Sequence, residues 1–153
     1  MDDIHEIIGE ETGIANQYMA FMVGAEIYGM KIEFVSEIIN VQTITVVPEV
    51  PFYIKGIINL RGKILPVMDV RLRFNKEPIE YNDRTCIIVI SIHNTLVGLI
   101  VDTVREVMEI LPEDIAYTGD AAAEMHNRYI KAIGKTEAGV VLLLDLDRLM
   151  SDN

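Results

Sequence analysis

The chain has 153 residues, of which 50% are hydrophobic and 24% are charged, and its 24 acidic and 13 basic side chains give a formal net charge of −11. A chain of this length buries enough surface to fold without a disulfide or a metal ion. The surplus of negative charge disfavours binding to nucleic acid, because such binding depends on neutralising phosphates. Uninterrupted apolar stretches such as 86–90 and 140–144 are far shorter than the ~20 residues that cross a bilayer, so no direct membrane insertion is expected.

The N-terminus and the single cysteine favour a cytoplasmic protein. Cys86 has no second cysteine with which to form an internal disulfide. The chain begins Met1-Asp2-Asp3, which is acidic where a secretory signal peptide would be basic. Residues 1–16 carry acidic side chains and only a weak apolar pattern. We therefore expect them to form a mobile leader ahead of a folded domain over 17–153.

From Gln17 onward, short runs rich in β-branched and aromatic residues alternate with turn residues, which is typical of a small all-β protein. The turn at 24–26 predicts a hairpin between strands at 18–23 and 27–30. Further strands are predicted over 41–47, 56–59, 63–68, 86–92, 96–101, 130–134 and 140–146. Short helical segments are predicted at 69–74, at 120–128 and at 147–150.

An internal repeat divides the chain into two related halves. Residues 17–38 align with 86–107, and the alignment is closest where Gly29 and Gly98 each begin the pattern Gly-x-x-Ile/Val-acid-x-Val-x-Glu-Ile/Val. With a longer offset, residues 53–57 align with 129–133. Because each half suits a five-stranded barrel, we expect two barrels, over about 17–80 and 84–146, followed by a short C-terminal helix.

The two halves differ most clearly at one turn. The first half has Asn59-Leu60-Arg61-Gly62 where the second has Lys135-Thr136-Glu137-Ala138, so the fold itself does not require an arginine there. Asparagine and glycine tolerate a positive φ and can form a tight turn that holds the arginine in a fixed direction. Arg61 is either a solvated turn residue or an anchor for a protein partner, because arginine is enriched at interface hot spots.

The residues that could support catalysis do not converge. The three histidines lack the spacing of a metal-ligand set, and no glycine-rich phosphate-binding motif is present. We therefore expect no enzymatic activity, no metal and no cofactor. Asp145 and Asp147 form a possible acid pair, but the first half has Asp69 and Arg71 at the same places, so a cap at the end of a strand is the better interpretation.

Residues 54–71 closely resemble the signature of the CheW family, the coupling proteins of bacterial chemotaxis. Other segments match the family in order and spacing, including Tyr28-Gly29, Tyr81-Asn82-Asp83 and Val97-Gly98. The regulatory domain of the kinase CheA shares this signature, as does a coupling protein with a receiver domain. Since 153 residues leave no room for a kinase or receiver domain, we expect a stand-alone adaptor.

The resemblance implies two SH3-like five-stranded barrels that join CheA to the cytoplasmic hairpin tips of chemoreceptors, in arrays beside the membrane. A receptor helix would be held in an apolar groove. By motif position, the residues implied for receptor binding are Ile32, Val35, Glu37, Gly56, Asn59, Arg61, Gly62, Cys86 and Ile87. Those implied for kinase binding are Val104 and Glu106.

Two further expectations follow for the groove and for the function. Val35 and Ile87 should be partly exposed in the free protein, because they would wait for the receptor helix. From the residues alone, the alternative function is a β-barrel module that binds a small anionic ligand through Arg61. An enzyme that uses Asp145 and Asp147 is a more remote alternative.

Overall fold

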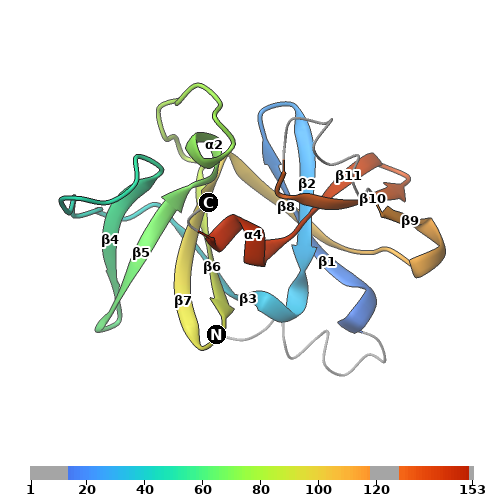
Figure 1. Ribbon diagram of the computed structural model, residues 1–153, viewed down its shortest axis with the longest axis horizontal. Helices are drawn as coiled ribbons and strands as arrows, with labels where there is room; N and C mark the ends of the chain where they lie inside the picture. Colours follow the sequence, from blue (N-terminus) through green and yellow to red (C-terminus); the bar gives the residue numbers. More distant parts are fainter. Residues whose placement is uncertain (1–13, 118–127, 152–153) are drawn as a thin grey trace. The chain divides into compact units, whose positions relative to one another are not determined.

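The computed structural model describes residues 14–117 and 128–151, and the segments outside these ranges are drawn as a grey trace in Figure 1. Residues 1–13 of the predicted leader and residues 120–127 of the predicted alanine-rich helix therefore lie outside the described residues.

The described chain is mostly β-structure, as predicted from the sequence. Its strands, in chain order, are β1 (Gln17–Val23), β2 (Glu26–Lys31), β3 (Val35–Asn40), β4 (Ile54–Leu60), β5 (Lys63–Asp69), β6 (Cys86–Ile92), β7 (Thr95–Val101), β8 (Thr103–Glu109), β9 (Ile115–Tyr117), β10 (Ile130–Thr136) and β11 (Gly139–Leu144). The described helices are all short, namely η1 (Ile14–Asn16), η2 (Ile32–Phe34), α2 (Val70–Arg73), η3 (Pro112–Asp114) and α4 (Leu146–Met150).

The predicted hairpin of β1 and β2 is confirmed, and so are the two predicted short helices that lie in described residues, but one predicted strand is wrong. Residues 41–47 form no strand apart from a single bridge at Thr45, and β3 precedes them. A register shift between Val35 and Glu37 interrupts β3, and its middle residues are only half-buried. These features remove the clean alternation that identifies a strand from sequence. The same weak alternation hides β8, whose residues are half-buried or exposed.

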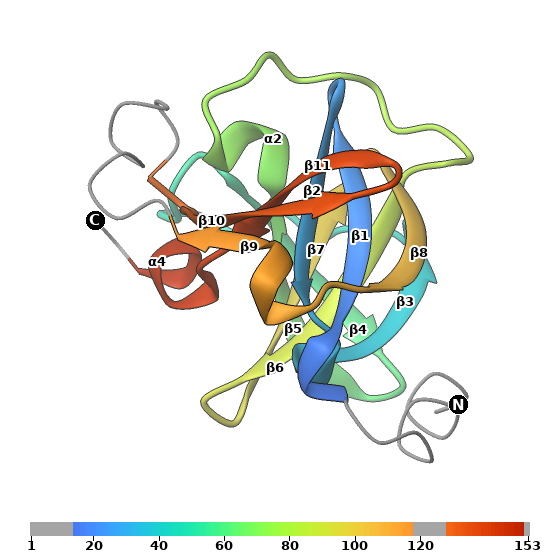
Figure 2. The same ribbon diagram turned by 90° about the vertical axis from the view of Figure 1, so that its right-hand side faces the viewer.

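The described chain divides into two compact units. Unit 1 comprises residues 34–104, and its five-stranded sheet has the order β3-β6-β7-β5-β4. Unit 2 comprises residues 14–33 and 105–151, and its sheet has the order β8-β1-β2-β11-β10-β9. Figure 2 shows β2 and β11 of unit 2 side by side; on its other edge, β11 forms a hairpin with β10. Unit 2 therefore has one strand more than the predicted five, the three-residue β9.

The structure corrects the predicted barrel boundaries of 17–80 and 84–146. Unit 1 combines β3, β4 and β5 of the first half with the β6–β7 hairpin of the second half. Unit 2 combines the β1–β2 hairpin of the first half with β8 to β11 of the second. The repeat identifies equivalent segments correctly. It does not indicate whether the β1–β2 and β6–β7 hairpins pack with their own half or with the other half, because the two hairpins are alike.

The last residues of the predicted leader are attached to unit 2. Residues 14–16 form η1, and the carbonyl oxygen of Asn16 accepts a hydrogen bond from the backbone N–H of Ile110 at 2.9 Å. Residues 14–16 thus belong to the folded unit 2, although the prediction placed them in the mobile leader.

Each unit contains one parallel strand pair, and the two pairs are equivalent in the repeat. The β5–β7 pair places Val67 opposite Gly98, and the β11–β2 pair places Leu143 opposite Gly29. A Cβ atom on Gly98 would lie 2.8 Å from Val67 Cγ1 and 2.8 Å from Ile87 Cγ2, closer than normal packing allows. Glycine is therefore needed where the two strands meet.

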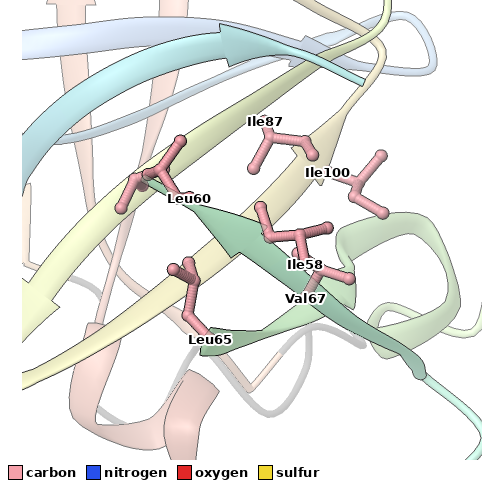
Figure 3. Packing of buried hydrophobic residues seen from close by; sticks show 7 residues of the cluster. Ile58, Leu60, Leu65, Val67, Ile87 and Ile100 are labelled. Atoms are coloured by element: carbon pink, nitrogen blue, oxygen red, sulfur yellow. The ribbon is translucent and has the colours of Figure 1, made fainter. Parts of the chain in front are cut away.

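The core of unit 1 is formed by side chains from four strands of its sheet. Figure 3 shows side chains from β4 and β5 meeting side chains from β6 and β7. The cluster consists of Ile58, Leu60, Leu65, Val67, Ile87, Val89 and Ile100. In unit 2 a second cluster consists of Tyr18, Ile110, Ala132, Val141 and Leu143.

Unit 1 is closed by a backbone bridge between the chain after β3 and the edge strand β4. Thr45 and Ile57 exchange two hydrogen bonds of 2.9 Å. Gly56 has a φ of 149°, and a Cβ atom there would lie 2.1 Å from the carbonyl oxygen of Thr45. The closure therefore depends on a glycine at this position. In unit 2, β9 makes the equivalent pairing, with Ala116 opposite Ile133.

Within the described residues, no helix has both the length and the apolar character needed to cross a lipid bilayer.

Candidate functional site

A tight turn between β4 and β5 carries Arg61 at the place where the sequence predicts one. Arg61 has a φ of 52° and Gly62 a φ of 88°, so both central residues of this two-residue turn are left-handed. The side-chain oxygen of Asn59 accepts the backbone N–H of Gly62 at 2.8 Å and braces the turn. A left-handed conformation costs an ordinary residue roughly 1–2 kcal/mol, so the fold maintains Arg61 at a cost.

Arg61 forms an ion pair with Glu37 of β3. Because β3 and β4 are the two outer strands of the unit 1 sheet, this pair links its opposite edges. The Glu37 side chain is 16% exposed, whereas that of Arg61 is 69% exposed. Surface ion pairs contribute about 0.2–1 kcal/mol, so the pair orients the guanidinium more than it stabilises the unit. The remaining N–H groups of Arg61 are available to a carboxylate of a partner.

An exposed aliphatic side chain stands beside this turn. Ile64 is 60% exposed and lies directly opposite Asn59 in the β4–β5 pairing. Sequence reasoning missed this position, because residues 64–68 are uniformly apolar or proline and show no alternation. The only available signal is its closeness to the turn, since the strand end beside a two-residue turn is exposed more often than the strand centre.

Two residues expected in an exposed groove are buried instead. Val35 is 1% exposed and Ile87 is 0% exposed, so the expectation of partial exposure is wrong. Ile87 belongs to the unit 1 core, because β6 lies between β3 and β7 and directs this side chain inward. Ile32 is also buried, at 1% exposure, and belongs to unit 2.

The remaining predicted positions lie at varied depths. Cys86 is half-buried opposite Asn40, three residues beyond Glu37 on β3, and its thiol contacts the carbonyl oxygen of Arg84 at 3.4 Å. On β8, Val104 is half-buried and Glu106 is exposed. Glu37, Asn59, Arg61 and Gly62 are thus the predicted residues that the structure brings together.

A second polar group in unit 1 centres on a buried carboxylate. Asp69 is 4% exposed, caps α2 by accepting the backbone N–H of Leu72 at 3.3 Å, and accepts the hydroxyl of Tyr81 at 2.7 Å. Burial and this bond to Asp69 raise the pKa of Tyr81 above its usual value. The equivalent Asp145 caps α4 through the backbone N–H of Arg148. This confirms the interpretation of Asp145 as a cap at the end of a strand.

The described residues include no group of three or more histidine, cysteine or acidic side chains placed to hold a metal ion.

Comparison with known proteins places these features in a family. The CheW-like domain matches residues 17–153. The chemotaxis protein CheW of Klebsiella aerogenes is 30% identical over 148 residues, which cover 97% of this chain and 88% of the relative. Protein FrzA of Myxococcus xanthus is 31% identical, over 88% of this chain and 84% of its own length.

A solved structure agrees with this likeness. The crystal structure of the scaffolding protein TtCheW from Thermoanaerobacter tengcongensis matches with a TM-score of 0.81 and 33% sequence identity. The match covers 90% of this chain and 89% of that one. The chain therefore belongs to the CheW-like family.

Proposed function

We propose that this protein is a non-enzymatic adaptor of bacterial chemotaxis that couples the kinase CheA to the cytoplasmic tips of chemoreceptors. It would act in the cytoplasm, at receptor arrays beside the membrane. The names of its relatives, which are chemotaxis and scaffolding proteins, support this proposal. The observation that carries it is the exposed Arg61 on a left-handed turn. At the equivalent position, the second half of the chain has Glu137 instead of an arginine.

The receptor surface that we propose is the β4–β5 turn with its neighbour on β3. Arg61 and Asn59 supply polar contacts, and Ile64 supplies the exposed apolar contact that a receptor helix needs. Val35 and Ile87 are buried and are therefore not part of this surface. Gly56 acts through the closure of unit 1.

The kinase surface is proposed on β8, where Glu106 is exposed and Val104 is half-buried. The expected partner there is the regulatory domain of CheA. Two separate surfaces on one chain raise the effective concentration of receptor and kinase for each other, so modest individual affinities suffice to build an array.

Arg61→Glu tests the receptor surface. Loss of an interface hot spot costs about 2 kcal/mol or more, so the affinity for a receptor-tip fragment should fall at least about 30-fold. The affinity for CheA, measured by calorimetry on the same sample, should not change. Lys63→Glu is the matched control, because Lys63 is exposed two residues away on the same hairpin and undergoes the same change of charge.

The control separates a specific contact from general electrostatics. If Lys63→Glu weakens receptor binding as much as Arg61→Glu does, net charge accounts for the effect and Arg61 is not an anchor. Arg61→Glu replaces a surface ion pair by two neighbouring carboxylates, so the melting temperature should fall by only a few degrees. A larger fall would assign Arg61 a structural role.

The alternative function, binding of a small anion through Arg61, receives less support. Small ligands are usually enclosed by the protein, but the Arg61 side chain is 69% exposed on a protruding turn. Gly62 beside it has open space where a Cβ atom would point. Saturation of Arg61 by inorganic phosphate at micromolar concentration would favour this alternative over the adaptor.

A further inference from the structure

The two halves of the chain are joined by strand pairing inside both units. In unit 1, β3 pairs with β6 and β5 pairs with β7, so two strands of the first half hydrogen-bond to two strands of the second. In unit 2, β1 neighbours β8 and β2 pairs with β11 in the same way. Every sheet in the described residues therefore needs strands from both halves.

The cores are shared in the same manner. In the unit 1 cluster, β4 and β5 of the first half contribute four side chains, and β6 and β7 of the second half contribute three. In the unit 2 cluster, Tyr18 comes from the first half, and the other four buried residues come from the second. A half taken alone would expose much of this apolar surface to water, which is strongly unfavourable.

The connection between the halves is attached to unit 1 on either side of a short exposed stretch. Before it, Arg71 donates a hydrogen bond to the carbonyl oxygen of Glu77 at 2.8 Å. After it, the hydroxyl of Tyr81 donates to Asp69 at 2.7 Å. Between these two points, residues 78–80 are exposed.

From this arrangement we infer that the two halves, residues 1–79 and 80–153, are obligate binding partners of each other, and that the bond between Ile79 and Glu80 is dispensable in the folded protein. The interaction surface of each half is a set of strand edges and apolar faces, and its partner is the other half. This inference does not depend on the proposed function.

The test is a specific cut in the folded full-length chain. A protease recognition sequence inserted between Ile79 and Glu80 is cleaved under native conditions, and the product is examined by size-exclusion chromatography with light scattering. We expect one species of the full mass that contains both fragments in equal amounts. The uncut insertion variant is the control for correct folding, and denaturant should separate the two fragments.

The thermal transition of the cut protein gives a second readout. Because unfolding would release two chains, its melting temperature should fall by about 5–10 °C on a 100-fold dilution, while that of the uncut variant should not change. Two separate folded fragments, aggregation after cleavage, or a melting temperature of the cut protein that is independent of concentration would each overturn the inference. The last result would mean that each half folds as a barrel of its own.

Discussion

The hydroxyl of Tyr81 is bonded to a buried carboxylate, so Tyr81→Phe should destabilise unit 1 measurably. In the wild type, Asp69 accepts the Tyr81 hydroxyl at 2.7 Å and the backbone N–H of Leu72 at 3.3 Å. The substitution removes the first, shorter bond and leaves the second. Hydrogen bonds to charged groups contribute about 1.5–3 kcal/mol. In a chain of this length, that loss corresponds to a fall in melting temperature of about 3–12 °C.

The destabilisation should depend on pH, and its sign follows from the raised pKa of Tyr81, which burial and the bond to Asp69 produce. Above the usual tyrosine pKa of about 10, the unfolded chain loses this proton while the folded chain retains it. The free energy of unfolding of the wild type therefore falls as the pH rises, by at most about 1.4 kcal/mol per pH unit, and by less because the side chain is partly exposed. Below pH ~10 the stabilisation is fully present.

Urea unfolding of both proteins between pH 7 and pH 11 provides the measurement. The difference in stability between the wild type and Tyr81→Phe should be constant to about pH 10 and then decrease. Tyr18, whose pKa is also raised by burial, is present in both proteins and does not affect the difference. Tyr117→Phe is the control, because Tyr117 is 75% exposed. A difference that stays constant up to pH 11 would refute the reasoning.

Four further substitutions test contacts within the two units, each by chemical denaturation. Gly98→Ala should cost about 1–3 kcal/mol and more than Gly29→Ala, because the added methyl meets side chains at 2.8 Å in the first case and at 3.0 Å in the second. Equal losses would contradict this ranking. Gly56→Ala should cost about 3 kcal/mol or more, since the methyl would collide with the backbone that closes unit 1, and a near-normal stability would show that the closure can shift. Arg71→Gln should cost about 1.5–3 kcal/mol, because Asp102 loses bonds of 3.0 and 3.1 Å to Arg71 Nε, and no loss would show the pair to be neutral.

Local sequence chemistry was sufficient to predict the turn that carries Arg61. Gly62 adopts the positive φ expected of it, but Asn59 contributes through its side-chain oxygen and not through a positive φ; the second left-handed residue is Arg61 itself. The caps by Asp69 and Asp145 are local features of the same kind. Each of these depends on residues within a few positions of one another.

The exposure of individual apolar side chains was not predictable from the chain alone. Residues 86–90 are apolar throughout, so their sequence does not show which side chains face the core. Ile87 is buried because neighbouring strands flank β6, and Ile64 is exposed because it lies at the end of a hairpin. Both outcomes depend on contacts between residues that are distant in the sequence.

The sequence by itself determined that this protein is an all-β chain of two related halves, with an arginine-bearing turn in one of them. The aligned glycines Gly29 and Gly98 occupy equivalent places in the structure, because each lies in the parallel strand pair of its unit. Only the tertiary structure decided that each unit takes its hairpin from the opposite half. The physical reason is that the β1–β2 and β6–β7 hairpins have similar strand patterns, so local preferences do not distinguish the two pairings, and only long-range packing selects one of them.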